Sequence, residues 1–185
     1  TVPTGATTGP ITITTPGGTV TTTTNFTVTP SFVTPYRVTN TLDSGPGSLR
    51  QAIDDANATA DDDVIEFNIA SGTNPYTIIL NSALPNILDA SSSGTLTITG
   101  LGAPSLTISG SDPTNAKNAT RDFRIFDIAS GGNLSISGVT VSGAQNITRN
   151  GGAFFNKGTL SITNSTISGN SADKFNSGGG IWNAG

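Results

Sequence analysis

The chain has 185 residues, with no cysteine, methionine or histidine, and only 11% of its residues are charged. The lack of cysteine excludes disulfide bonds and thiolate metal sites. The net charge is −4, and no Lys/Arg cluster is present that would displace counterions from a phosphate backbone, so we expect no nucleic-acid partner. No apolar run approaches the ~20 residues of a membrane-spanning helix.

The composition is typical of bacterial proteins that work outside the cell, because it is rich in Thr, Ser, Asn and Gly and has little charge. The chain begins at Thr1 without a methionine or a signal peptide and stops at Gly185 within a repeat. We therefore expect a mature or excised part of an extracellular or cell-surface protein.

The first segment predicts a β-hairpin. Two β-branched runs, Ile11–Thr15 and Thr19–Thr24, flank the turn sequence Pro16-Gly17-Gly18. A hairpin alone is marginally stable in water, so this one needs a further surface, from its own protein or from a neighbouring molecule. The segment resembles the closing strands of an IPT/TIG domain, an immunoglobulin-like module. The resemblance implies that residues 1–30 end a β-sandwich that serves as a spacer.

A cap is predicted next, at residues 36–69, after a linker at residues 31–35. Its helix, at about residues 48–57, follows a Gly-Pro-Gly loop and has Ser48 as a candidate N-cap. Four apolar residues recur on one face of this helix: Leu49, Ala52, Ile53 and Ala56.

Residues 70–185 contain an internal repeat. Leu134–Gly143 matches Leu160–Gly169 at an offset of 26 residues, and Gly152–Asn156 matches Gly179–Asn183 at an offset of 27. A period of this length indicates a solenoid. Alternating strands with a bend at each glycine predict an all-β fold, a right-handed parallel β-helix whose turns stack Leu, Ile and Val inside and Ser and Thr outside.

The cap and the repeats together resemble extracellular β-helix proteins of bacterial surfaces that carry a SLREAI-type capping motif. Here the motif is Ser48-Leu-Arg-Gln-Ala-Ile53, with Gln51 in place of the glutamate. The rungs resemble theirs in "GTLSITNSTISGNSA" and "GGGIWNAG". The resemblance implies an adhesin-like surface protein in which the helix closes one end of the coil.

The chemistry that the residues would allow is sparse. Asp61, Asp62 and Asp63 could bind calcium through hard oxygen ligands, or could form a solvated turn between the helix and the next strand. No other metal or cofactor is expected. The aromatic group formed by Phe154, Phe155, Phe175 and Trp182 could stack on sugars if exposed, but its place in the alternation favours the core.

Many β-helix proteins are polysaccharide lyases or hydrolases, and glycoside hydrolysis needs a pair of facing carboxylates. The acidic residues of the repeats are Asp89, Asp112, Asp122, Asp127 and Asp173. They do not recur at the spacing of the turns and so cannot stack into a facing pair, and we therefore predict no catalytic residues. The segment Ser111–Arg124, with Arg121 and Arg124, is either a groove wall or a solvated loop.

Six Asn-x-Ser/Thr sequons offer glycosylation sites if the host glycosylates: Asn25, Asn57, Asn118, Asn133, Asn146 and Asn164. Asn156 and Asn164 are also predicted as corner residues whose side chains bond the turn backbone.

The expected function is structural and non-enzymatic: an extracellular stalk or self-assembling fibre segment that associates through strand edges or coil ends. Surface glycans or proteins of neighbouring cells are further possible partners. The alternatives are a polysaccharide-active enzyme and a glycan-binding adhesin module.

Overall fold

The computed structural model describes residues 7–27, 35–70, 72–110, 123–146, 150–172 and 178–184. Its contacts divide the chain into two compact units, Thr1–Phe32 and Val33–Gly185. The division falls inside the linker predicted at residues 31–35.

The first unit carries the predicted hairpin. Strands β1 (Gly9–Thr15) and β2 (Gly18–Phe26) pair antiparallel, with Ile13 opposite Val20 and an irregular register near Pro10. The β-branched runs form the strands because such side chains fit the pleated backbone, and the intervening Pro-Gly turn reverses the chain.

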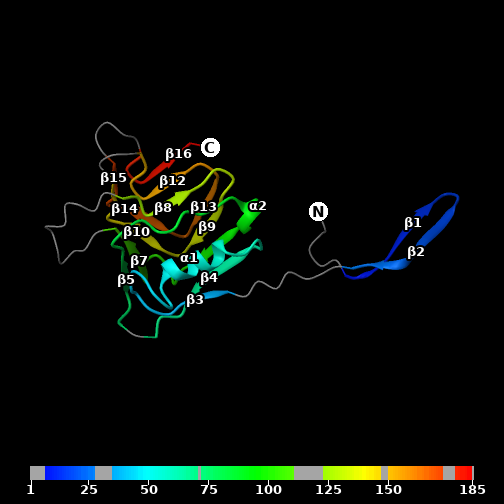
Figure 1. Cartoon of the computed structure of the whole chain (residues 1–185), viewed down its shortest axis with the longest axis horizontal. Coiled ribbons are helices and arrows are strands. Elements are labelled where there is room, and N and C mark those ends of the chain that lie inside the picture. Colours follow the sequence, from blue (N-terminus) through cyan, green and yellow to red (C-terminus); the bar gives the residue numbers. More distant parts are fainter. Residues whose placement is uncertain are drawn as a thin grey trace. The chain divides into compact units, whose positions relative to one another are not determined.

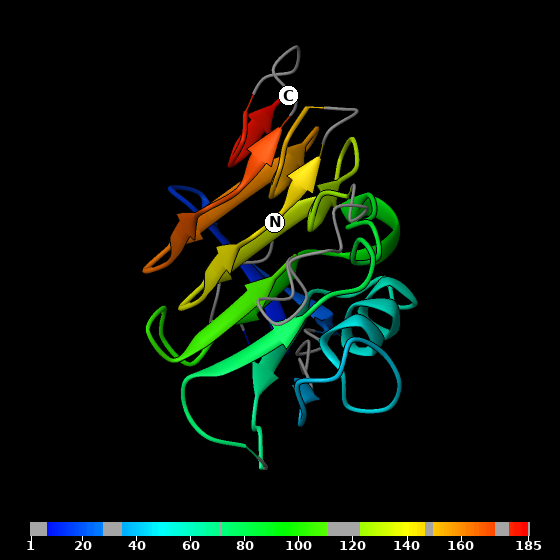
Figure 2. The ribbon, with the colours of Figure 1, turned by 90° about the vertical axis from the view of Figure 1, so that its left-hand side faces the viewer.

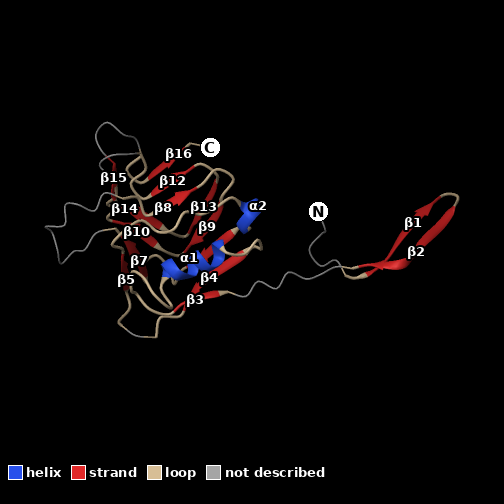
Figure 3. Ribbon diagram, in the orientation of Figure 1, coloured by secondary structure: helices blue, strands red, loops and turns tan. Residues whose placement is uncertain are grey.

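The second unit is a parallel β-solenoid of about four turns with a helix near its start (Figures 1 and 3). Its longest sheet contains, in spatial order, β13 (Thr159–Thr163), β9 (Asn133–Ser137), β6 (Leu96–Thr99), β4 (Asp63–Phe67) and β3 (Tyr36–Val38). A second sheet contains β14 (Thr166–Ser168), β10 (Thr140–Ser142), β7 (Leu106–Ser109) and β5 (Tyr76–Ile79). A third contains β16 (Ile181–Asn183), β12 (Phe154–Asn156) and β8 (Phe126–Ile128), and β11 (Gln145–Asn146) pairs with β15 (Ser171–Ala172).

The prediction of an all-β fold with parallel, stacked turns is confirmed. The turns follow one another in chain order along the stack, with the red strand β16 at one end (Figure 2). Leu134 pairs with Leu160 and Phe154 with Ile181, so both predicted offsets are register relations between adjacent turns.

Ladders of identical or similar side chains fill the interior. In the longest sheet Ile65, Ile98, Ile136 and Ile162 stand at one register position of successive strands. The first three are 0–1% exposed. The period-two alternation places the intervening Ser and Thr residues on the outside, which is the arrangement expected from the sequence.

The helix α1 (Leu49–Asn57) lies between β3 and β4 in the chain and occupies the first turn. Ser48 is its N-cap, and the Ser48 hydroxyl accepts a hydrogen bond of 3.2 Å from the Gln51 N–H. The four apolar residues predicted on one face, Leu49, Ala52, Ile53 and Ala56, are buried in the same core as the ladders. The helix therefore packs its apolar face into the core beside β3 and β4.

A second helix, α2 (Ala90–Ser93), was not predicted. Its N-cap is Asp89, whose carboxylate accepts a hydrogen bond from the Ser91 N–H. One turn of Ala and Ser carries no apolar periodicity, so the sequence gives no signal for it.

Candidate functional site: the open end of the solenoid

The last turn of the solenoid presents strand edges. Within the described residues β13, β14, β15 and β16 each have a sheet neighbour on one side, toward the preceding turn. Alternate N–H and C=O groups along the other edge of each strand are thus available for pairing with another strand.

The core is also uncovered at this end. Leu134 and Ile136 are 0% and 1% exposed in the preceding turn, whereas their register partners Leu160 and Ile162 are only partly buried. Ile181, which stands above the fully buried Phe154, is 43% exposed. Among the described residues no further turn lies over these side chains.

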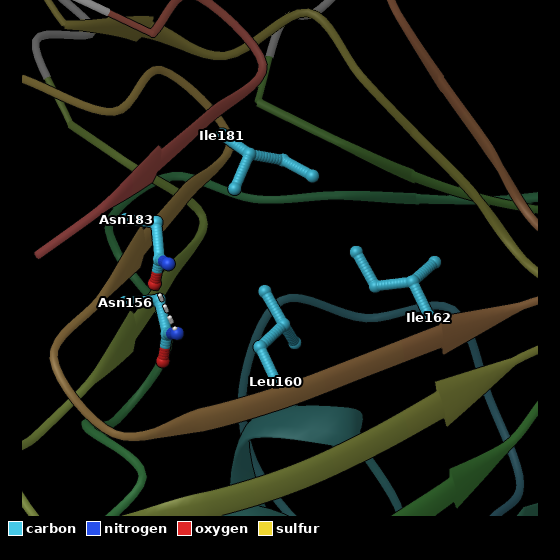
Figure 4. A pocket seen from close by; sticks show the side chains of 5 residues that line it. All are labelled: Asn156, Leu160, Ile162, Ile181 and Asn183. Atoms are coloured by element: carbon cyan, nitrogen blue, oxygen red, sulfur yellow. Dashed lines mark hydrogen bonds between the residues drawn. The ribbon is translucent and has the colours of Figure 1, made fainter. Parts of the chain in front are cut away.

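These side chains surround a cavity of about 330 Å³, here called the mouth; it is lined by Asn156, Leu160, Ile162, Ile181 and Asn183. Figure 4 shows Leu160 and Ile162 rising from β13 on the same side, toward Ile181 on the facing strand. The side-chain amide of Asn156 donates a hydrogen bond of 2.7 Å to the side-chain oxygen Oδ1 of Asn183 at the rim.

Asn156 is a corner residue, as predicted: its side chain accepts a hydrogen bond of 3.1 Å from the Gly158 N–H and donates one of 3.1 Å to the Gly158 carbonyl. Asn164 has a φ of 48° and takes the position of Gly138, with a φ of 66°, in the preceding turn. Asparagine tolerates this left-handed backbone better than most residues.

The mouth is free of charge. Residues 159–172 and 181–184 contain no Asp, Glu, Lys or Arg. A site made of aliphatic side chains, amides and backbone edges suits the binding of an extended apolar segment, because it can bury apolar surface and satisfy backbone hydrogen bonds together.

The prediction that the aromatic group belongs to the core was wrong for two of its members. Phe154 is fully buried and stacks on Phe126 with ring centroids 4.9 Å apart. Phe155 and Trp182 project to the opposite, outer face and stack on each other at 4.7 Å. Phe175 lies outside the described residues.

Two cations accompany this outer pair. The Arg124 guanidinium lies 3.9 Å and the Lys157 ammonium 4.9 Å from the centre of the Phe155 ring. Arg124 also forms an ion pair of 2.9 Å with Asp127, the register neighbour of Phe155. We call Phe155, Trp182, Arg124, Lys157 and Asp127 the outer aromatic column. Sequence spacing predicted the Phe155–Trp182 pairing but not the two cations. Arg124 comes from the preceding turn, before β8, and Lys157 from the corner after β12.

The aspartates proposed for calcium serve the local structure. The Asp62 carboxylate accepts a hydrogen bond of 2.8 Å from the Thr95 N–H, and the Asp63 carboxylate accepts one of 2.7 Å from the Thr59 hydroxyl. In the part of the chain that the structure describes, no three Asp, Glu, His or Cys side chains gather closely enough to hold a metal ion.

The acids of the repeats also have separate roles where they are described. Asp89 caps α2, and the hydrogen bond from the Ser91 N–H lowers the pKa of its carboxyl, while Asp127 pairs with Arg124. Asp112, Asp122, Asp173 and Arg121 lie outside the described residues, as does most of the segment predicted as a groove wall or loop.

An ion pair that the sequence did not reveal anchors the helix α1. Arg50 lies 2.8 Å from the Asp43 carboxylate and donates further hydrogen bonds to the carbonyls of Ser82, at 3.0 Å, and Ala83. Burial raises the pKa of Asp43, but the hydrogen bonds from Arg50 and from the Asn81 N–H, with the Arg50 charge, outweigh it and lower the pKa below 3.8. Arg50 thereby connects α1 to the segment that follows β5.

The sequons are unequally placed. Asn25 and Asn164 are exposed. Asn57 and Asn133 use their amides as donors, to the Asn86 carbonyl at 2.9 Å and the Thr95 hydroxyl at 3.2 Å. Asn118 and the side chain of Asn146 lie outside the described residues.

Comparisons of the chain with protein-family models, with curated proteins and with solved structures give no match. In the described residues no helix is long and apolar enough to cross a membrane.

Proposed function

We propose that this chain is a structural, non-enzymatic module of an extracellular stalk or fibre, and that it associates through the open end of its solenoid. The observation that carries the proposal is the contrast between the two ends. In the first turn α1 buries its apolar face in the core, whereas the last turn exposes Leu160, Ile162 and Ile181 beside uncharged strand edges. Natural proteins normally protect such edges with charges, prolines or covering elements.

The solenoid suits a mechanical role. Each turn contacts its neighbours through continuous ladders and parallel hydrogen bonds, so stability grows with the number of stacked turns. An extracellular location agrees with the low charge and the absence of cysteine.

The first test is the mass and shape of the purified chain, measured by light scattering over a wide concentration range and by negative-stain electron microscopy. Self-association requires a mass that rises with concentration and end-joined particles or filaments. Uniform monomers at the highest concentration would refute the proposal.

A second candidate, a glycan-binding module, is favoured by the outer aromatic column. Aromatic rings provide apolar faces for sugars, and the Lys157 ammonium beside Phe155 provides a charge for an acidic sugar. The test is saturable binding of a polyuronate without turnover. Trp182→Ala should abolish this binding, and Thr163→Ala, on the outer face of another sheet, should leave it intact. Depolymerisation of the glycan would instead favour the enzyme alternative.

A further inference from the structure

The two cations of the outer aromatic column are not equivalent. The Arg124 side chain is only 10% exposed, and its 2.9 Å ion pair neutralises Asp127. The Arg124 guanidinium also lies against the Phe155 ring. A buried charge that loses its partner strongly destabilises a fold, so this cation is held by the protein itself. Arg124 therefore serves to position the ring and the carboxylate beside it.

Lys157 is placed differently. Its side chain is exposed, and its ammonium lies 4.9 Å from the centre of the Phe155 ring. Among the described residues no carboxylate forms an ion pair with it. A lysine ammonium has three N–H donors, so it can lie beside a ring and still donate to a ligand. Lys157 is thus the cation of the column that an acidic ligand can contact.

The backbone fixes Lys157 in this place. Its N–H donates a hydrogen bond of 3.0 Å to the Ile128 carbonyl of the preceding turn, and the Asn156 side chain bonds both the N–H and the carbonyl of Gly158. A Cβ at Gly158 would collide with the Gly132 carbonyl oxygen, so the corner packs closely on the turn beside it. A contact from a group held in advance loses less free energy to ordering when a ligand binds.

The column belongs to the side of the coil. Phe155 alternates along β12 with the buried residues Phe154 and Asn156, so its ring points outward. The turns of a solenoid stack along its axis. A neighbouring turn therefore extends the outer face and does not lie over it.

The charge of the whole chain acts against acidic ligands. The net charge is −4, so long-range attraction does not draw a polyanion to this protein. Any preference for an acidic ligand must come from a local contact. A fixed ammonium beside outward aromatic rings supplies such a contact for a ligand that combines carboxylates with apolar ring surface.

We propose that the outer aromatic column binds a carboxylated polysaccharide and that Lys157 selects its acidic form. Lys157 donates to a sugar carboxylate while the sugar lies against Phe155 and Trp182, and the Arg124–Asp127 pair positions Phe155 without contacting the ligand. This inference rests on the glycan-binding candidate of the proposed function, and it adds the class of glycan and the residue that selects it.

The test compares two forms of one polymer, polygalacturonate and the same polymer with its carboxyl groups methyl-esterified, by titration calorimetry with the full chain. The variants are Lys157→Gln and a matched control, Arg37→Gln. Arg37 is a 58% exposed cation on β3, so the two variants have the same net charge. We expect the wild type and Arg37→Gln to prefer the acidic polymer. Lys157→Gln should lose about three- to five-fold of that preference, as for an exposed ion pair, and should bind the ester as the wild type does.

A third variant, Lys157→Arg, retains the charge and should keep the preference for the acidic polymer. Loss of the preference in both Lys157 variants would assign it to packing against Phe155 and overturn the inference. The same preference in Lys157→Gln as in the wild type would also overturn it, and so would an equal loss in Arg37→Gln, which would make net charge the cause.

The wild type separates this inference from the candidate function. Equal binding of the two polymers by the wild type would overturn the selection by Lys157 and leave the glycan-binding candidate standing. A wild type that binds neither polymer would overturn both.

Discussion

Replacement of two isoleucines at the same ladder position by alanine will measure how much stability depends on a neighbouring turn on each side. Ile136 is 1% exposed and has register partners on both sides, Ile98 and Ile162. Replacing a buried isoleucine by alanine costs roughly 2–5 kcal/mol, and we expect about 3.5 kcal/mol for Ile136→Ala. Ile162 has the same sheet position but is covered on one side only. We expect Ile162→Ala to cost about half as much, because part of the removed surface already contacts water.

The free energy of unfolding is obtained from urea titrations, at a dilution where light scattering gives the mass of a monomer. Both variants should unfold with the slope of the wild type, so that the shift in midpoint reports stability alone. Equal losses for Ile136→Ala and Ile162→Ala in the monomer would refute the reasoning, since they would mean that the mouth is already covered.

Three further outcomes follow from local contacts. Folding lowers the pKa of Asp43, so the ionised carboxylate stabilises the fold at pH values above the unfolded pKa of 3.8. This stabilisation is lost as the pH falls through the folded pKa. In urea titrations Asp43→Asn should therefore be less stable than the wild type at pH 7, with a smaller difference at low pH. Ser48→Ala should cost about 1 kcal/mol by removal of the N-cap, and Ser48→Thr less, as measured by thermal unfolding. Gly94 and Gly169 both have a positive φ, of 65° and 61°. Gly169→Ala, which meets open space, should cost about 1 kcal/mol. Gly94→Ala should cost several times more, because its Cβ would collide with the Asp61 carbonyl and its ψ of −165° adds backbone strain. Equal effects of the two alanines, measured by thermal unfolding, would contradict the predicted collision at Gly94.

The class of fold could be predicted from the sequence because each turn of a solenoid repeats the residue pattern of the turn before it. The offsets of 26 and 27 residues gave the register of adjacent turns, and strict alternation of aliphatic and hydroxyl residues assigned the faces of β9 and β13. The helix was equally legible, since Leu49, Ala52, Ile53 and Ala56 define one face and Ser48 a cap. In each case the prediction depended only on residues that are close in the sequence or one repeat apart.

Contacts between different sides of the coil had no such signal. The Arg50–Asp43 ion pair and the bonds of Arg50 to Ser82 and Ala83 depend on where loops of unequal length bring the chain. The same holds for Arg124, which reaches Phe155 from another turn. No period relates these positions in the sequence.

What the sequence determined by itself was therefore the class of fold, the register of its turns and the buried face of the helix α1. Tertiary structure decided which aromatic residues left the core, which aspartates were committed to hydrogen bonds, and how deeply the last turn is exposed. The physical reason is that alternation and period fix the direction of a side chain relative to its own strand, whereas burial and charge pairing depend on what other segments place beside it.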